Sequence, residues 1–149
     1  MKYIECSEIY VPRNGEMPLF LTGGISECEV WQEDLIEKLK YSDLTLINPR
    51  RKDYDFNDPN IETQQVEWGF EHLHKARGVS FRFPPQTLCP ITLYELGKIS
   101  VGNKPLFIRV HPDYKRKRDI EIQTGLIRPD VKIVHSLDDL VEQIREWGQ

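Results

Sequence analysis

Short runs of apolar residues alternate along the chain with longer segments in which apolar residues recur every three or four positions. Short runs closed by glycine, proline or polar residues predict buried strands, and the longer segments predict amphipathic helices. The predicted strands are residues 18–22, 44–47, 79–83, 106–110 and 131–134. The predicted helices follow residue 26, cover about 61–76, run from Pro90 or Thr92 to Val101, and cover 137–147.

Polar residues mark the ends of several predicted helices. Ser26 and Glu29 have the spacing of a capping box before the first helix, and Ser136 is placed to cap the last one. Gly102 is a plausible end of the third helix. We expect a polar loop over 50–60, at most a helical turn around 119–126, and irregular structure over 1–17 with room for a short edge strand.

Alternation of strands and helices implies parallel pairing through right-handed crossovers. The pattern therefore predicts an α/β protein with a three-layer, flavodoxin-like or Rossmann-like fold and a mostly parallel sheet of about five strands. A length of 149 residues fits one domain over 1–149. In such folds, ligands bind beyond the carboxyl ends of the strands, so we expect the functional residues at that edge of the sheet.

The overall charge narrows the possible partners. A net charge of −4 gives no reason to expect a nucleic-acid polymer, and the basic run 115–118 is interpreted as a solvated turn, with a phosphate contact as the alternative. No apolar run reaches the roughly 18–20 residues that span a bilayer, and the N-terminus does not resemble a signal peptide. Three scattered cysteines indicate neither a disulfide framework nor a metal site, which favours a cytoplasmic protein that needs no metal or other cofactor.

Residues at the predicted strand ends supply the candidate site. Glycines allow a ligand to approach the backbone, and arginines can bind phosphate or carboxylate. The candidate substrate-binding residues are Gly23, Gly24, Ile25, Asn48, Arg50, Arg51, Phe83 and Thr92. These residues also have simpler explanations. The glycines could form only a turn, the arginines could be surface residues that compensate the charge of the acidic loop 53–62, and Phe83 could belong to the core.

Glu95 is the candidate catalytic residue. It lies near the start of the predicted helix that follows the strand 79–83. A carboxylate at that position would face the ligand crevice. The alternative is structural, since Thr92 and Glu95 also have the spacing of a capping box. Spacing alone does not decide between the two.

Several of these motifs together resemble the nucleoside 2-deoxyribosyltransferase-like family. The similarity is carried by Glu95-Leu96-Gly97 before Lys104-Pro105-Leu106-Phe107, by the stretches 21–25 and 48–51, and by Gln65-Val66-Glu67-Trp68. It covers about residues 18–110. The resemblance implies retaining glycosyl transfer in which Glu95 is the nucleophile that attacks C1′ of a 2′-deoxyribonucleoside or its 5′-monophosphate. A second base or water would resolve the ester, and no cofactor is needed.

The chain departs from that family at two positions. Well-studied members carry aspartates where this chain has Gly78 and Cys89, so the usual groups for base recognition and protonation are missing. Asp53, Asp55 and Glu67 are possible substitutes. Family members are usually oligomers in which a neighbouring subunit completes the pocket, and we expect residues 122–126 to form such a loop in a homo-oligomer.

Two other hypotheses stay open at this stage. The chain could be a non-catalytic nucleoside- or nucleotide-binding module with the same pocket, because the aspartates are missing. It could also be a generic flavodoxin-like domain in which Glu95 only caps a helix. Arg50 and Arg51 favour a phosphorylated ligand.

Overall fold

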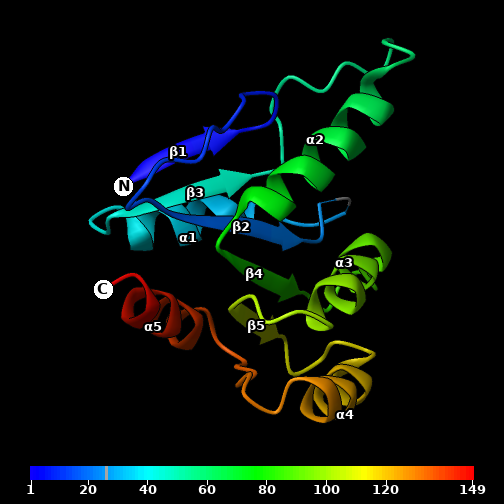
Figure 1. Cartoon of the computed structure of the whole chain (residues 1–149). Coiled ribbons are helices and arrows are strands. Elements are labelled where there is room, and N and C mark those ends of the chain that lie inside the picture. The colour runs from blue at the N-terminus through cyan, green and yellow to red at the C-terminus, as the bar shows by residue number, and fades with distance from the viewer. Residues whose placement is uncertain (26) are drawn as a thin grey trace.

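The computed structural model describes residues 1–25 and 27–149, and its centre is a five-stranded parallel sheet (Figure 1). The strands are β1 (Lys2–Glu5), β2 (Met17–Gly23), β3 (Leu44–Asn48), β4 (Gly78–Phe83) and β5 (Leu106–Val110). They lie in the order β1-β3-β2-β4-β5. This arrangement, with helices on both faces, confirms the predicted α/β class and is consistent with a flavodoxin-like fold.

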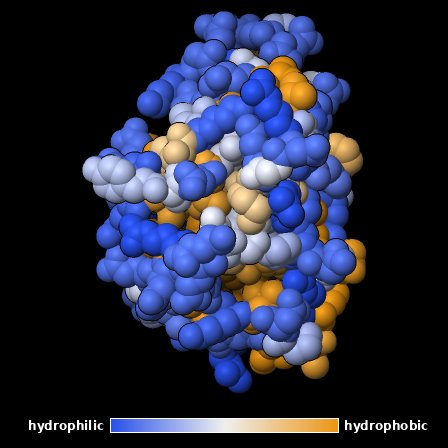
Figure 2. Space-filling model, turned by 60° about the vertical axis from the view of Figure 1, so that its left-hand side comes forward, coloured by the Kyte–Doolittle hydropathy of each residue, from blue (hydrophilic) through white to orange (hydrophobic). Residues whose placement is uncertain are grey.

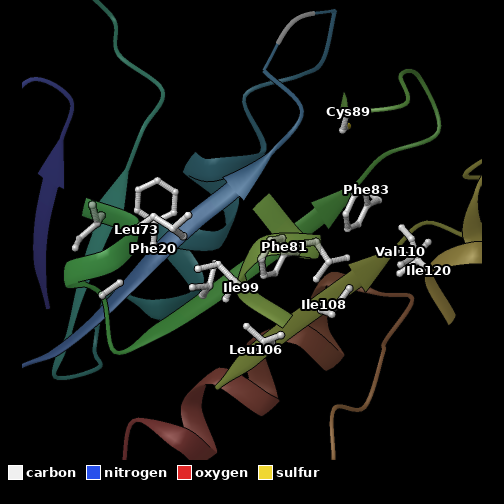
Figure 3. Close-up of a cluster of buried hydrophobic side chains, with 14 of the residues drawn as sticks. Phe20, Leu73, Phe81, Phe83, Cys89, Ile99, Leu106, Ile108, Val110 and Ile120 are labelled. Carbon is white, nitrogen blue, oxygen red and sulfur yellow. The ribbon is translucent and has the colours of Figure 1, made fainter. Parts of the chain in front are cut away.

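Two apolar clusters hold the helices to opposite faces of the sheet. One face packs α1 (Trp31–Leu39) and α5 (Leu137–Trp147) against side chains such as Leu19 and Leu21. The other packs α2 (Ile61–Lys75), α3 (Pro90–Ser100) and α4 (Lys117–Ile127) against Phe20 and its neighbours (Figure 3). Successive side chains of a strand point to opposite faces, so each strand contributes to both clusters. No helix in the described part of the chain is both long and apolar enough to cross a membrane.

The fifth strand is not the one the sequence predicted. Residues 131–134 form only an isolated bridge between Arg109 and Val134, and β1 occupies the opposite edge, paired with β3 from Lys2–Thr45 to Glu5–Asn48. Arg128 binds the carbonyls of Gly102 and Lys104 just before this segment, and α5 starts just after it. Little chain is therefore left for ladder pairing. The short edge strand that we expected to be possible within residues 1–17 is present as β1.

Helix starts also differ in part from the prediction. Helix α1 begins at Trp31 after Val30, so Glu29 is not part of a capping box; Ser26 lies outside the described residues. Helix α4 covers 117–127, so residues 122–126 are helical rather than a loop, and the basic run 115–118 straddles the start of that helix. Ser136 does cap α5, since its hydroxyl accepts a hydrogen bond from the Asp139 N–H at 3.1 Å.

The connections reverse direction at β2, which fixes where a ligand can bind. After β2 the chain crosses one face to β3, and after β3 it crosses the other face to β4 on the far side of β2. The loops that follow β2 and β4 therefore leave toward opposite faces. We call the switch point at the carboxyl ends of these two strands the crevice, because such folds bind their ligands there. In Figure 1, α3 lies at this edge and both chain termini lie at the opposite one.

Candidate active site

Glu95 lies in the second turn of α3, at the crevice between β2 and β4. The helix begins at Pro90 after Cys89, whose φ of 51° places it in the left-handed region. Glu95 is thus too far along the helix to reach the free N–H groups of the first turn, and Thr92 is inside the helix rather than before it. The capping-box interpretation of Thr92 and Glu95 is wrong.

The Glu95 carboxylate instead binds a neighbouring strand. The Thr22 hydroxyl, at the end of β2, donates a hydrogen bond of 2.5 Å to Oε2 of Glu95. Burial raises the pKa of Glu95, while the Thr22 hydrogen bond and the positive charge of Lys98 oppose that rise. The site therefore holds a poorly solvated carboxylate with one hydrogen-bond donor fixed on it.

Gly23 and Gly24 allow the elements around Glu95 to approach one another. A Cβ on Gly23 would lie 2.6 Å from the Trp31 ring of α1 and 3.1 Å from Arg82 of β4. A Cβ on Gly24 would lie 2.8 Å from the sulfur atoms of both Cys28 and Cys89. The glycines are thus required by close packing, and the adjacent Ile25, 39% exposed, faces solvent at the same edge.

The predicted ligand contacts at the end of β3 and just after it hold neighbouring loops in place. Their side chains are therefore not free to face the crevice. The buried Asn48 donates a hydrogen bond to the Tyr3 hydroxyl and accepts one from the Arg50 N–H, both 2.9 Å long. Arg50 binds the carbonyl oxygens of Cys28 and Glu29 and so fixes the loop between β2 and α1. Arg51 is held by Asp53 through two hydrogen bonds of 2.8 and 3.1 Å.

Two further predicted ligand contacts are buried in the protein. Phe83 has no exposed surface and packs against Tyr114 with ring centroids 5.2 Å apart, so it cannot stack on a base (Figure 3). Thr92 is 3% exposed on the inner side of α3. Both residues lie near a strand or helix end, which is why the sequence indicates ligand contact. Their side chains are nevertheless buried in the protein.

The two positions that lack the family aspartates have different surroundings. Gly78 starts β4, at the edge opposite Glu95, and a Cβ there would lie 2.9 Å from the Trp147 ring. A side chain at 78 would therefore disturb the packing of α5 rather than reach Glu95. Cys89 does border the site, and burial raises the pKa of its thiol to about 11, so the group is a neutral thiol.

The carboxylates considered as substitutes all have exposed side chains: Asp53, Asp55 and Glu67. Asp53 pairs with Arg51, and Asp55 accepts a hydrogen bond from the Asn57 N–H. Within residues 1–25 and 27–149, no three His, Cys, Asp or Glu side chains form a group that could hold a metal ion.

Two arginines that the sequence analysis missed lie at the same edge, on the α1 face. Arg82 and Arg109 are paired in register as the penultimate residues of β4 and β5. Arg82 is 5% exposed, and its Nη2 donates a 2.7 Å hydrogen bond to Oε1 of Glu29. A cation near the carboxyl end of each of two otherwise apolar strands is the signal that would have identified them.

Two surface grooves lie away from this edge. One of about 670 Å³ is bordered by α1 and α5, and another of about 480 Å³ lies between α5 and the start of β5. The side of the molecule that carries the chain termini, seen in Figure 2, is mostly hydrophilic. Neither groove includes Glu95 or any other residue of the crevice, so the functional assignment depends on the chemistry at the strand ends.

Comparison with known proteins identifies a family and a structural neighbour. Residues 16–114 match the family described as nucleoside 2-deoxyribosyltransferase like. No curated protein matches the chain. The crystal structure of a conserved protein from Enterococcus faecalis V583 is similar, with a TM-score of 0.58 and 15% identity. The match covers 89% of this chain and 99% of that one, and it supports the fold alone.

Proposed function

The chain belongs to the nucleoside 2-deoxyribosyltransferase-like family, and from that premise we propose that it cleaves N-glycosidic bonds through Glu95. Its substrates would be 2′-deoxyribonucleosides or their 5′-monophosphates. The observation that carries the proposal is the position of the Glu95 carboxylate: partly buried, hydrogen-bonded to Thr22 and placed at the crevice between β2 and β4. A carboxylate that only capped α3 would lie in the first turn.

The proposed reaction has two steps. An oxygen of the ionised Glu95 carboxylate attacks C1′, the bond from C1′ to the base nitrogen breaks, and the base leaves with that electron pair and takes up a proton. The resulting ester is then attacked at C1′ by a second base or by water, which releases the carboxylate. Transfer and hydrolysis differ only in this second step.

Desolvation and the Thr22 hydroxyl have complementary roles in this mechanism. A poorly solvated carboxylate is a better nucleophile, but burial alone would favour its protonated form. The Thr22 hydrogen bond favours the ionised form and fixes one oxygen, Oε2, which leaves Oε1 for the attack. Thr22 is thus a positioning residue for the proposed nucleophile.

A binding module without turnover is the second candidate function. It is favoured by Cys89, a neutral thiol at the position where the resemblance leads us to expect an aspartate. Such a protein would keep its nucleoside pocket without a group to protonate the departing base.

Chromatography of reaction mixtures tests the two candidates. The wild-type protein and Glu95→Gln would be incubated with each 2′-deoxynucleoside and 5′-monophosphate, with and without a free acceptor base. We expect free base or exchanged nucleoside from the wild type, and a loss of at least about 1000-fold in Glu95→Gln, because an amide cannot replace the nucleophile. Glu142→Gln, at an exposed glutamate on α5, is the matched control.

The possible results separate the candidates. Exchange abolished in Glu95→Gln indicates a transferase, and free base alone indicates a hydrolase. Ligand binding that raises the melting temperature without any turnover would favour the binding module. Turnover that survives Glu95→Gln would contradict the assignment of the nucleophile.

A further inference from the structure

Two desolvated arginines occupy paired positions of β4 and β5 on the α1 face of the crevice, and the carboxylate of Glu29 is bonded to only one of them. Arg82 Nη2 binds Glu29 at 2.7 Å, while Arg82 Nη1 is buried and has no hydrogen-bond partner among the described residues. Within the same part of the chain, the Arg109 guanidinium makes no hydrogen bond, although Glu29 and Asp138 act on its charge. Asp138 itself is paired with Lys38 at 2.8 Å.

This arrangement leaves positive charge uncompensated. Burial lowers the pKa of both Arg82 and Arg109, and the two like charges disfavour each other, so the site stores an unfavourable electrostatic energy. Buried charges in proteins are normally paired. A monoanionic carboxylate can neutralise only one of the two guanidinium groups.

The Glu29 carboxylate can be displaced more easily than the arginines. Its side chain is 68% exposed, whereas the Arg82 side chain is 6% exposed beneath it and packs against the Trp31 ring. Glu29 also lies two residues before the start of α1, and a helix N-terminus favours a nearby anion. A ligand anion could therefore replace Glu29 while both arginines stay in place.

We propose that Arg82 and Arg109 form an anion subsite for a phosphate monoester, which Glu29 covers in the absence of ligand. A phosphate dianion compensates both guanidinium groups and offers three acceptor oxygens for their planar arrays of N–H donors. The subsite rests on the proposed function in one respect: its phosphate is the 5′-phosphate of the 2′-deoxynucleotide whose C1′ faces Glu95.

The position of the subsite fits a ligand that spans the crevice. Gly23 is paired in register with Arg82, and the preceding residue, Thr22, binds Glu95 on the opposite face. Between the two charged groups the chain consists of Gly23 and Gly24, and the space beside both glycines is filled by packed side chains. A nucleotide with its sugar at Glu95 would therefore reach Arg82 by passing beyond the carboxyl end of β2. Arg50 and Arg51, which the sequence favoured for this role, are bound elsewhere.

Binding measurements on Glu95→Gln, in which turnover is blocked, test the subsite at low ionic strength. Each 2′-deoxynucleoside 5′-monophosphate, the corresponding nucleoside and inorganic phosphate would be titrated by calorimetry. We expect monophosphates to bind at least about tenfold tighter than nucleosides, and Arg109→Gln to remove that difference. Glu29→Gln should tighten phosphate binding by about threefold or more, because it removes the competing anion.

Control variants and competition make the result specific. Arg13→Gln and Glu33→Gln make the same charge changes at exposed positions before β2 and in α1 and should leave the affinities unchanged. Inorganic phosphate should compete with monophosphates but not with nucleosides; if it binds without competing, free phosphate rather than a nucleotide is the ligand, and the nucleotide assignment fails. The subsite itself would be overturned if Arg109→Gln kept the preference for phosphate, or if Glu29→Gln bound phosphate no better than its parent.

The two proposals fail in distinguishable ways. Equal binding of nucleosides and monophosphates, with turnover that depends on Glu95, would refute the subsite and leave the glycosidic reaction intact. Phosphate binding that depends on Arg109, in a protein without turnover, would refute the glycosidic reaction and leave the subsite intact.

Discussion

On the α3 face of the sheet, the desolvated charged group at the strand ends is a carboxylate, whereas on the α1 face it is a pair of guanidinium groups. Burial disfavours the charged form on both faces, so it raises the pKa of Glu95 and lowers that of Arg82 and Arg109. The faces differ in how this cost is offset. Glu95 has a neutral hydroxyl that favours its charge, whereas of the two arginines only Arg82 is paired, with one exposed carboxylate.

Under the two proposals above, this difference allows one crevice both to bind a ligand and to react with it. A nucleophile must stay free of a strong ion pair, because neutralising it would reduce its reactivity. An anion-binding group has no such limit and can be held by a counterion until the ligand arrives. Gly23 separates the two environments, because a side chain at that point would push α1 and β4 apart.

Gly23→Ala should have the largest effect on this arrangement. The added methyl group would lie 2.6 Å from the Trp31 ring and 3.1 Å from the backbone oxygen of Arg82, so the packing must shift. We expect a loss of about 2 kcal/mol or more in the free energy of unfolding, measured with urea. Gly69→Ala, in α2 with open space around it, should instead stabilise the protein by about 0.5–1 kcal/mol. Equal effects of the two changes would argue against close packing at Gly23.

Thr22→Val should have an intermediate effect, on activity rather than on stability. Without the hydroxyl, the ionised form of Glu95 loses its hydrogen bond, so the pKa of Glu95 should rise further. We expect kcat/KM at neutral pH to fall roughly tenfold and its acid limb to move to higher pH. Thr45→Val, at a buried threonine in the neighbouring strand β3, is the control. A uniform loss of activity with an unchanged pH profile would show that Thr22 acts only through packing.

Glu95→Gln should have the smallest effect of the three, on stability. The folded-state pKa of Glu95 lies above its ordinary value of 4.5, so the folded chain binds a proton that the unfolded chain has already lost. Stability then falls as pH rises through that interval. Glutamine cannot ionise, so we expect it to raise the melting temperature by roughly 1–3 °C at pH 7. The gain should disappear below pH 4.5, and a lower melting temperature at pH 7 would contradict the desolvated site.

Much of the fold could be predicted from the sequence, because local patterns determine it. The apolar runs at 18–22, 44–47, 79–83 and 106–110 are strands within a residue at either end, and Ser136 caps α5 as expected. The exception concerns pairing: 131–134 has the composition of a strand, but only its last residue reaches β5. Which segment occupies a sheet edge depends on the reach of the chain and its anchoring contacts, which composition does not encode.

The candidate site was predictable only in outline. Glu95, Gly23 and Gly24 do meet at the crevice, because residues that follow parallel strands must gather at one edge of the sheet. The roles of Asn48, Arg50 and Phe83 could not be predicted, since each is near the right edge but its side chain is bound or buried elsewhere.

The pattern of residues along the chain established the class of fold, the strands β2 to β5 and the edge at which functional residues gather, because the period of apolar residues and the direction of parallel strands set all three. The three-dimensional packing was needed to show that Glu95 binds Thr22 instead of capping α3, and that Arg82 binds Glu29 beside Arg109. Such pairings join residues distant in the chain. They are set by which face of a strand each side chain occupies and by what packs against it.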